Sequence, residues 1–385
     1  MSVVSVLRRS EPVVSRQKED VAAVAKRTRR QHVVSAFYLR GFANEGARLF
    51  RTPLSGASPH PIAVSDATVR NDFYTVPGRA GEPSDVFEKF FAQLEGDAVP
   101  GLAGLTAPEP RFPDGDTRAS LSMWIALQYL RSEGIRMSGT EMRAVEVQIT
   151  VGISGRQRLR ELIESREGTT ISDARVDAEW ADLTQPGGTR IQPDPRDHIA
   201  SIMDMLPGVS GLIHHSPWML LRFTRKALVT SDHPVFLIPS LDANPWEGVG
   251  LANAFGYGIA LDRHTGLVIV TSGAGDGVPD HVVPPSAFYA KLLNQQVIRN
   301  ARKAVYHHPD DDPREALDGL LPPERSTEME VVPRTFPEDG WGASVSVSPA
   351  RLPTLPAEED DGSESWTIDD LPWPIPGRVF QYEGD

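Results

Sequence analysis

Apolar residues change their spacing along the chain. In several stretches between residues 86 and 206 they recur every three or four positions, which is the repeat of an amphipathic helix, and short strands are expected earlier at 48–51 and 71–76. After Pro217 they form short runs separated by turn residues, which is typical of strands. The pattern predicts an α+β fold: a mainly helical N-terminal part packed on a small, mainly antiparallel sheet over 217–272, with a late C-terminal helix.

The clearest predicted helix spans 117–132 and has an apolar stripe around Trp124. Another is expected over 86–95, because Ser84 or Asp85 can cap its first turn. Further helices are predicted over 140–166, over 197–206 as far as a break or kink at Pro207, and from Pro284 to Tyr306; 168–195 is predicted to be a loop.

The strand-like spacing predicts two strands at 218–223 and 227–230. It also predicts a hairpin with arms at 257–261 and 267–271, because the residues between them favour a turn. These strands would make up most of the sheet.

Charge divides the chain into three parts. Residues 1–30 contain eight Lys and Arg against three acidic residues, whereas 309–385 contain five Arg against nineteen. We therefore expect a basic flexible leader over 1–29, a single compact α+β domain over 30–308 and an acidic Pro-rich tail over 309–385. The leader could contact nucleic acid or a membrane, but a solvated arm is the simpler interpretation.

Composition excludes several classes of protein. The absence of cysteine rules out disulfides, thiolate metal sites and cysteine nucleophiles. No run of eighteen apolar residues and no signal-peptide pattern is present, so we expect a cytoplasmic protein without a membrane partner. No nucleotide-binding loop, zinc-finger spacing or nucleophile elbow occurs either.

The stretch from Gln31 to Phe42 combines apolar anchors with side chains that form several hydrogen bonds. It is too polar for a plain core segment, which predicts a buried polar network. His32 is a candidate general base or metal ligand, because its pKa lies nearest neutrality. A hydrogen-bonded core histidine is the alternative. Gln31 and Tyr38 are candidate substrate-binding residues.

Two predicted helices carry candidate chemistry. Glu88 and Glu95 are seven residues apart, so they share one helix face and could divide acid and base roles or hold a divalent cation. A solvated helix face is the common alternative. Gln128 and Arg131 lie on a largely apolar helix, where an arginine needs a partner such as one of these glutamates. Their pairing would be structural or would hold an anionic substrate.

Asp232 lies in the segment Ser231–Pro234, which contains the letters of a hydrolytic triad. Adjacent side chains point in different directions, so a triad within this segment is implausible. Asp232 would instead cap backbone amides of a turn or reach a site from the end of a strand. The pairs His214–His215 and His307–His308 are expected at the surface.

These stretches together resemble the bacterial domain of unknown function 4238 family over roughly 30–308. The first motif is Gln31-His32-x5-Tyr38-Leu39-x2-Phe42, and the second is Thr230-Ser231-Asp232-x-Pro234. The resemblance implies a helical first half and a β-containing second half, and no established activity. The chain has Val33 and Ser35 where the family has an aromatic residue and a proline. Further likeness is found at Asp72–Tyr74, Glu88, Glu95, Gln128, Arg131, Trp218 and Asn294–Tyr306.

The candidates favour a metal-assisted hydrolase acting on a phosphate-bearing small molecule or nucleic acid. In this hypothesis the ion is Mg²⁺ or Mn²⁺, the catalytic residues are His32, Glu88, Glu95 and Asp232, and the substrate-binding residues are Gln31, Tyr38, Gln128 and Arg131. The competing hypotheses are a non-catalytic binding or effector protein, whose polar cluster specifies the fold, and a scaffold recruited through the acidic tail.

Overall fold

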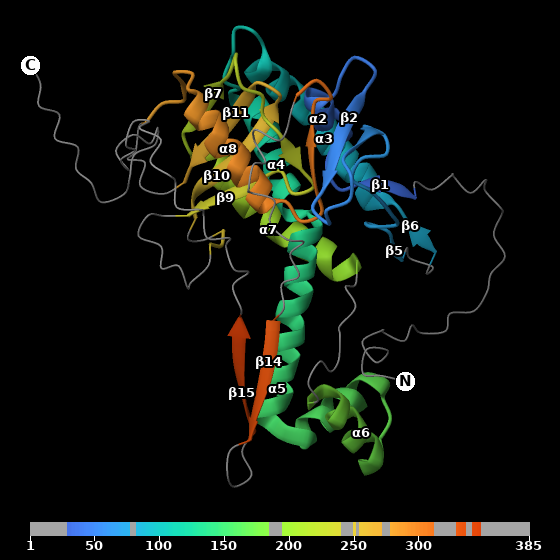
Figure 1. Cartoon of the computed structure of the whole chain (residues 1–385). Helices are drawn as coiled ribbons and strands as arrows, with labels where there is room; N and C mark the ends of the chain where they lie inside the picture. The colour runs from blue at the N-terminus through green and yellow to red at the C-terminus, as the bar shows by residue number, and fades with distance from the viewer. Residues whose placement is uncertain are drawn as a thin grey trace, which may run out of the picture. The chain divides into compact units, whose positions relative to one another are not determined.

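The computed structural model describes residues 29–77, 82–184, 195–239, 249–251, 254–271, 278–311, 329–335 and 341–347 (Figure 1). The protein is an α+β protein. Contacts divide it into a larger unit of 28–134, 199–325 and 352–385 and a smaller unit of 1–27, 135–198 and 326–351. This division places 135–198 outside the body that we expected to be one domain over 30–308.

A five-stranded sheet lies at the centre of the larger unit. Its neighbours are antiparallel except for β12 and β7, which are parallel. The predicted hairpin is present, since β10 and β11 are joined by a two-residue turn. In spatial order the strands are β12 (His281–Val283), β7 (Trp218–Arg222), β11 (Thr265–Val270), β10 (Ala254–Asp262) and β9 (Phe236–Pro239).

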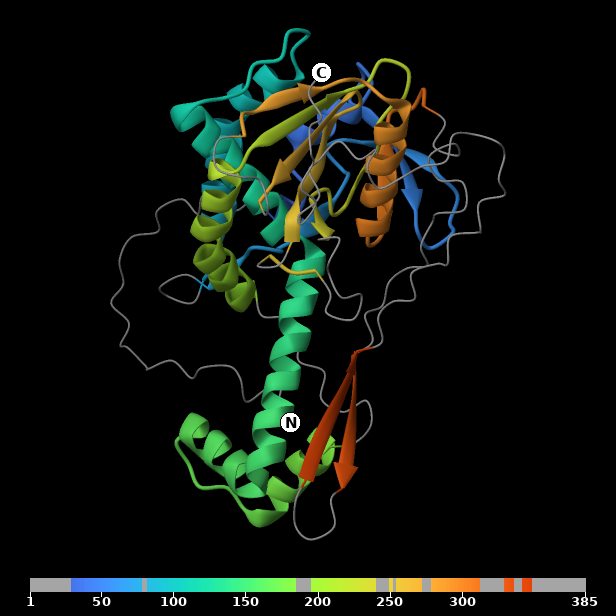
Figure 2. The ribbon, with the colours of Figure 1, turned by 90° about the vertical axis from the view of Figure 1, so that its left-hand side faces the viewer.

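Helices cover both faces of this sheet, which explains why its central strands are apolar throughout. Helix α8 (Ala287–Asn300) lies on one face and α4 (Gly115–Leu130) on the other (Figures 1 and 2). On the α4 face the rings of Tyr129 and Tyr257 meet edge to face, with centroids 6.5 Å apart. Every residue of β10 before Asp262 is buried, and so is every residue of β11. A strand buried on both faces needs no polar alternation.

A second sheet brings distant segments together. In spatial order it contains β3 (His60–Ala63), β2 (Arg48–Pro53), β13 (Ala304–His307) and β8 (Thr230–Ser231), all antiparallel. Strand β13 pairs with β2 across some 250 residues of chain, so residues 304–307 lie beside residues 50–53.

The candidate residues are carried by short elements next to these sheets. Strand β1 (Arg30–His32) pairs antiparallel with β4 (Val69–Asn71), and the chain then enters α2 (Ala36–Leu39) and the 3₁₀ turn Arg40–Phe42. The strands β5 (Val76–Pro77) and β6 (Pro83–Ser84) pair before α3 (Val86–Thr106), which packs against α4. Asp85 occupies the expected N-cap position of α3, but its side chain makes no capping hydrogen bond.

The smaller unit takes most of α5 (Glu133–Glu167), all of α6 (Asp173–Thr184) and the hairpin of β14 (Met329–Thr335) and β15 (Trp341–Val347). Helix α5 changes direction at Gly155, whose φ of 71° lies in the left-handed region that favours glycine. Helix α7 (Pro195–His215) begins in the smaller unit and ends in the larger one.

Several expected boundaries are wrong. The predicted loop over 168–195 contains α6, because Val176 and Trp180 bury an apolar face against Leu159 and Ile163. Helix α7 continues through Pro207, and α8 ends at Asn300, so that 304–307 form a strand and not a helix.

Three further expectations are corrected or fall outside the described residues. His307 is buried against Phe50, although we expected it at the surface. Of the predicted strand at 227–230, only Thr230 is in a strand. The leader up to residue 28 and the tail beyond 347 lie outside the described residues.

Candidate functional site

Ser35 connects the first motif to α4. Its Oγ accepts hydrogen bonds from Trp124 Nε1 (2.9 Å) and Arg131 Nη2 (2.7 Å). The Gln128 amide satisfies its neighbours when its oxygen faces them, accepting from Ser35 Oγ at 3.0 Å and from Arg131 Nε at 2.8 Å. The hydroxyl then accepts twice and donates once, so its hydrogen-bonding capacity is used in full.

Arg131 is buried, with 1% of its side chain exposed, and it needs a counter-charge. Glu95 supplies it, since Arg131 Nη1 donates to Glu95 Oε1 at 2.7 Å. Burial alone would lower the pKa of Arg131, but the charge of Glu95 and this hydrogen bond outweigh burial and raise the pKa. The predicted pairing of Arg131 with a glutamate is therefore confirmed. With Ser35 and Gln128 it completes a closed set of contacts around the guanidinium, which we call the Arg131 network.

Glu88 lies on α3, one turn before Phe91. Its pKa is affected by the charges of the Arg131–Glu95 ion pair. Burial raises the pKa of Glu88 to about 7, against the lowering effect of Arg131. The neighbouring carboxylates Glu95 and Asp85 raise this pKa further. Glu88 is therefore present in both protonation states near neutral pH.

His32 is the last residue of β1 and also responds to this ion pair. Burial lowers the pKa of His32, while a hydrogen bond to the Val64 backbone and the charge of Glu95 act in the opposite direction. Within the part of the chain that the structure describes, its Nε2 is buried and has no hydrogen-bond partner. The ring is therefore mainly neutral at pH 7, and Nε2 is the nitrogen available to take a proton.

Glu95, Gln128 and Arg131 are thus in direct contact, and the charges of the Glu95–Arg131 pair act on the pKa values of two further candidates, Glu88 and His32. Gln128 and Arg131 belong to the closed network, and Glu95 links that network to Glu88 and His32. We call His32, Glu88 and Glu95 the acid–base cluster. A carboxyl whose pKa is raised to about 7 and an imidazole whose pKa is lowered, both acted on by the charges of one ion pair, are suited to proton transfer.

Gln31 and Tyr38 are held by backbone and side-chain contacts nearby. Gln31 Oε1 accepts from the Tyr74 backbone amide at 2.6 Å, which ties β1 to the turn before β5. The Tyr38 hydroxyl donates to the Ala260 carbonyl and shares a hydrogen bond with Thr230 Oγ1, both at 2.7 Å. These contacts anchor the first motif to the sheets.

Asp232 directly follows β8, at the end of that strand of the four-stranded sheet, and does not contact the Arg131 network through any hydrogen bond or ion pair among the described residues. Its carboxylate accepts from the backbone amides of Arg302 (3.0 Å) and Lys303 (2.9 Å), just after α8 ends. Burial raises the pKa of Asp232, and these backbone hydrogen bonds partly offset the effect. Because Asp232 binds the backbone amides of Arg302 and Lys303, these amides do not continue the hydrogen bonding of α8, and the chain turns into β13.

Ser35 is the residue that the sequence did not reveal. It stands between Val34 and Ala36, and the one sign of its importance was that it replaces a proline of the resembled family. A hydroxyl in an otherwise apolar run must find partners when it is buried, and Ser35 is fully buried.

Two general features of the described residues complete the site. Among them, no group of three or more His, Asp or Glu side chains is arranged to hold a metal ion. None of the helices over these residues is both long and apolar enough to cross a membrane.

Comparison with known proteins gives one match. A family model described as "Protein of unknown function (DUF4238)" matches residues 30–311, a span that contains every candidate residue. No curated protein and no solved structure matches the chain.

Proposed function

The chain belongs to the DUF4238 family of proteins of unknown function, and we propose that its acid–base cluster is the active site of a hydrolase. The observation that carries this proposal is the carboxyl of Glu88, whose pKa is raised to about 7 beside an ion pair that fixes its surroundings. A carboxyl poised at neutrality is the form that general acid–base catalysis needs at physiological pH.

In the proposed reaction the buried Nε2 of His32 becomes accessible when substrate binds and takes a proton from a water molecule. The water oxygen attacks the phosphorus of a phosphate ester, and the bond to the leaving oxygen breaks. Protonated Glu88 gives its proton to that oxygen. The cycle closes when the proton held by His32 passes to solvent and Glu88 takes a proton from solvent. In this scheme Glu95 and Arg131 contact neither the attacking water oxygen nor the leaving oxygen. They are positioning residues that hold the charges around Glu88 and His32.

A phosphate-bearing substrate is proposed because a cation lies beside His32. Arg30 precedes it by two residues on β1, its side chain is 60% exposed and pairs with Asp66 at 2.5 Å, and its charge contributes to the lowered pKa of His32. Arg131 is committed to Glu95, Ser35 and Gln128, so the proposal assigns substrate charge to Arg30, whose exposed pair with Asp66 the phosphate would replace.

A non-catalytic binding protein is the second candidate. The closed Arg131 network supports it, because buried polar groups that satisfy one another are suited to specifying a fold. In that case Glu88 and His32 would titrate without turning over a substrate.

A hydrolysis screen separates the two candidates. Nucleotides, phosphate monoesters, phosphodiesters and nucleic acid are incubated with the full-length protein, with Mg²⁺, with Mn²⁺ and with a chelator. The hydrolase proposal expects turnover that falls on the order of 10²-fold or more in Glu88→Gln and in His32→Ala. The control is Asp97→Asn, an exposed acid on the same helix, which should leave the rate unchanged. Activity that survives folded Glu88→Gln would overturn the assignment of the site.

A further inference from the structure

On the face of the central sheet that is covered by α8, strand β10 has two glycines, Gly256 and Gly258. Strand β10 reads Ala-Phe-Gly-Tyr-Gly-Ile-Ala-Leu-Asp, and alternate residues of a strand point to opposite faces. Tyr257 points toward α4, as its ring contact with Tyr129 shows. Gly256 and Gly258 therefore fall on the α8 face, where β10 contributes no side chain.

Side chains of the two neighbouring strands, β9 and β11, lie beside these two glycines. Phe236 pairs with Gly258 and lies over it, so closely that a Cβ on Gly258 would meet the Phe236 ring at 2.2 Å. Ile238 pairs with Gly256 on one side, and Val268 pairs with Gly258 on the other. Glycine is thus required at 258, and the ring of Phe236 has a fixed place in the floor.

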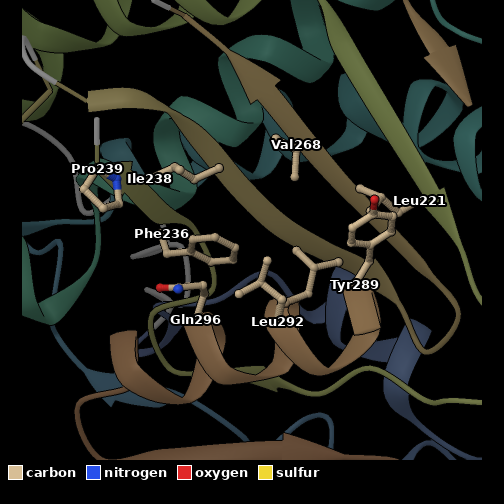
Figure 3. A pocket seen from close by; sticks show the side chains of 9 residues that line it. Leu221, Phe236, Ile238, Pro239, Val268, Tyr289, Leu292 and Gln296 are labelled. Atoms are coloured by element: carbon tan, nitrogen blue, oxygen red, sulfur yellow. The ribbon is translucent and has the colours of Figure 1, made fainter. Parts of the chain in front are cut away.

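One face of α8 forms the opposite wall. Tyr289, Leu292, Leu293 and Gln296 follow the three- and four-residue spacing of a single helix face and line the pocket. Figure 3 shows Tyr289, Leu292 and Gln296 on the side of α8 that faces the sheet. With Leu221, Phe236, Ile238, Pro239 and Val268 they line a pocket of about 390 Å³, solvent at its mouth included. Phe236, Val268 and Leu221 are buried, whereas Leu292, Tyr289 and Gln296 are partly exposed at the open side.

We propose that this pocket, which we call the α8 pocket, binds a neutral aromatic molecule of one or two rings. Among the described residues that line it, none carries a charge, so an ionic ligand would lose its hydration without compensation from them. The amide of Gln296 is the polar group that can fix a hydroxyl or amine of the ligand.

The α8 pocket is separate from the acid–base cluster. Arg131 and Gln128 belong to α4 and its end, on the face of the sheet opposite to α8 (Figure 2). The two sites can therefore be tested independently, and failure of the hydrolase proposal would not affect this one.

Fluorescence titration with 2-naphthol tests the proposal on the full-length protein. We expect saturable binding with a dissociation constant on the order of 10–500 μM, typical of a ligand of this size. The anion 2-naphthoate should bind at least about tenfold more weakly. The absence of saturable 2-naphthol binding at millimolar protein and ligand would overturn the proposal, as would equal binding of the anion.

Variants locate the binding. Leu292→Trp places a large ring at the mouth of the pocket and should reduce affinity about tenfold or more, whereas Leu212→Trp, at an exposed leucine of α7, should leave it unchanged. If folded Leu292→Trp binds like the native protein, the α8 pocket is not the site. Should that variant fail to fold, Gln296→Leu decides the question: it should weaken 2-naphthol several-fold and leave naphthalene unaffected. Equal affinity for 2-naphthol in Gln296→Leu and the native protein would contradict the proposal.

Discussion

The two faces of the central sheet hold opposite kinds of interior. On the α4 face, Arg131 is buried together with a carboxylate, a hydroxyl and an amide that use its donors. On the α8 face, apolar side chains of the sheet and of α8 line a space that is open to solvent at its mouth. A buried charge forces its surroundings to close around it, whereas apolar walls can remain apart at modest cost. Substitutions should therefore be costly on the first face and mild at the rim of the second.

The largest expected effect is that of Arg131→Met. The change leaves the Glu95 carboxylate half-buried without its cation, and Ser35 and Gln128 each lose a partner. We expect a loss of about 3–5 kcal/mol in the free energy of unfolding, measured by urea denaturation. Arg111→Ala, at an exposed arginine, is the control and should change stability by less than about 0.5 kcal/mol. A similar small change in Arg131→Met would mean that the network does not stabilise the fold.

A smaller loss is expected for Ser35→Ala. The variant keeps the ion pair but leaves Trp124 Nε1 and one Arg131 donor without their acceptor. Unmade buried hydrogen bonds predict a loss of about 1–3 kcal/mol in the same denaturation experiment. Ser55→Ala, in an exposed turn, provides the comparison and should behave like the native protein. Equal stability of Ser35→Ala would show that Gln128 alone can satisfy the guanidinium.

Glu88→Gln should have an effect that depends on pH. A carboxyl whose pKa is raised in the folded state gives stability that is present below its unfolded pKa of about 4.3 and is lost as pH rises through about 7. The glutamine cannot ionise, so this variant should melt a few degrees above the native protein at pH 8. The difference should vanish at pH 4. Because Glu88 is partly exposed, solvent screening limits the gain to about 1 kcal/mol.

The smallest effect is expected at the rim of the α8 pocket. Leu292→Ala removes a partly exposed side chain beside space that is already open, so it should cost less than about 1 kcal/mol. Leu293→Ala is the matched comparison, because Leu293 is buried and would contact a Cβ placed on Gly266. Removal of a buried leucine should cost about 2–5 kcal/mol. If the two alanine variants lost the same stability, the pocket would be closed in solution.

Local pattern was sufficient to predict part of this molecule. The hairpin of β10 and β11 and the core of α4 followed from spacing alone, and the partner of Arg131 followed from the cost of burying a charge. The pairing of β13 with β2 joins segments far apart in sequence, and no local signal specifies such a contact. The end of α8 depends in the same way on Asp232, which approaches from another strand.

Within the site, helical spacing placed Glu88 and Glu95 on a common side of α3. It could not distinguish their environments, because these depend on Arg131 reaching one carboxylate and not the other. The role of Ser35 was hidden for a similar reason. Its partners come from α4, about ninety residues further along the chain.

The central claim is that Glu88 titrates near neutrality, and one measurement tests it directly. Protein labelled with ¹³C at the glutamate side-chain carboxyls is titrated by NMR from pH 3 to pH 9, and the Glu88 resonance is assigned by its absence in Glu88→Gln. The structure predicts a pKa of about 7 for this resonance. A Glu88 resonance that titrates with a pKa near the ordinary glutamate value of about 4.3 would contradict the acid–base cluster and the hydrolase proposed from it.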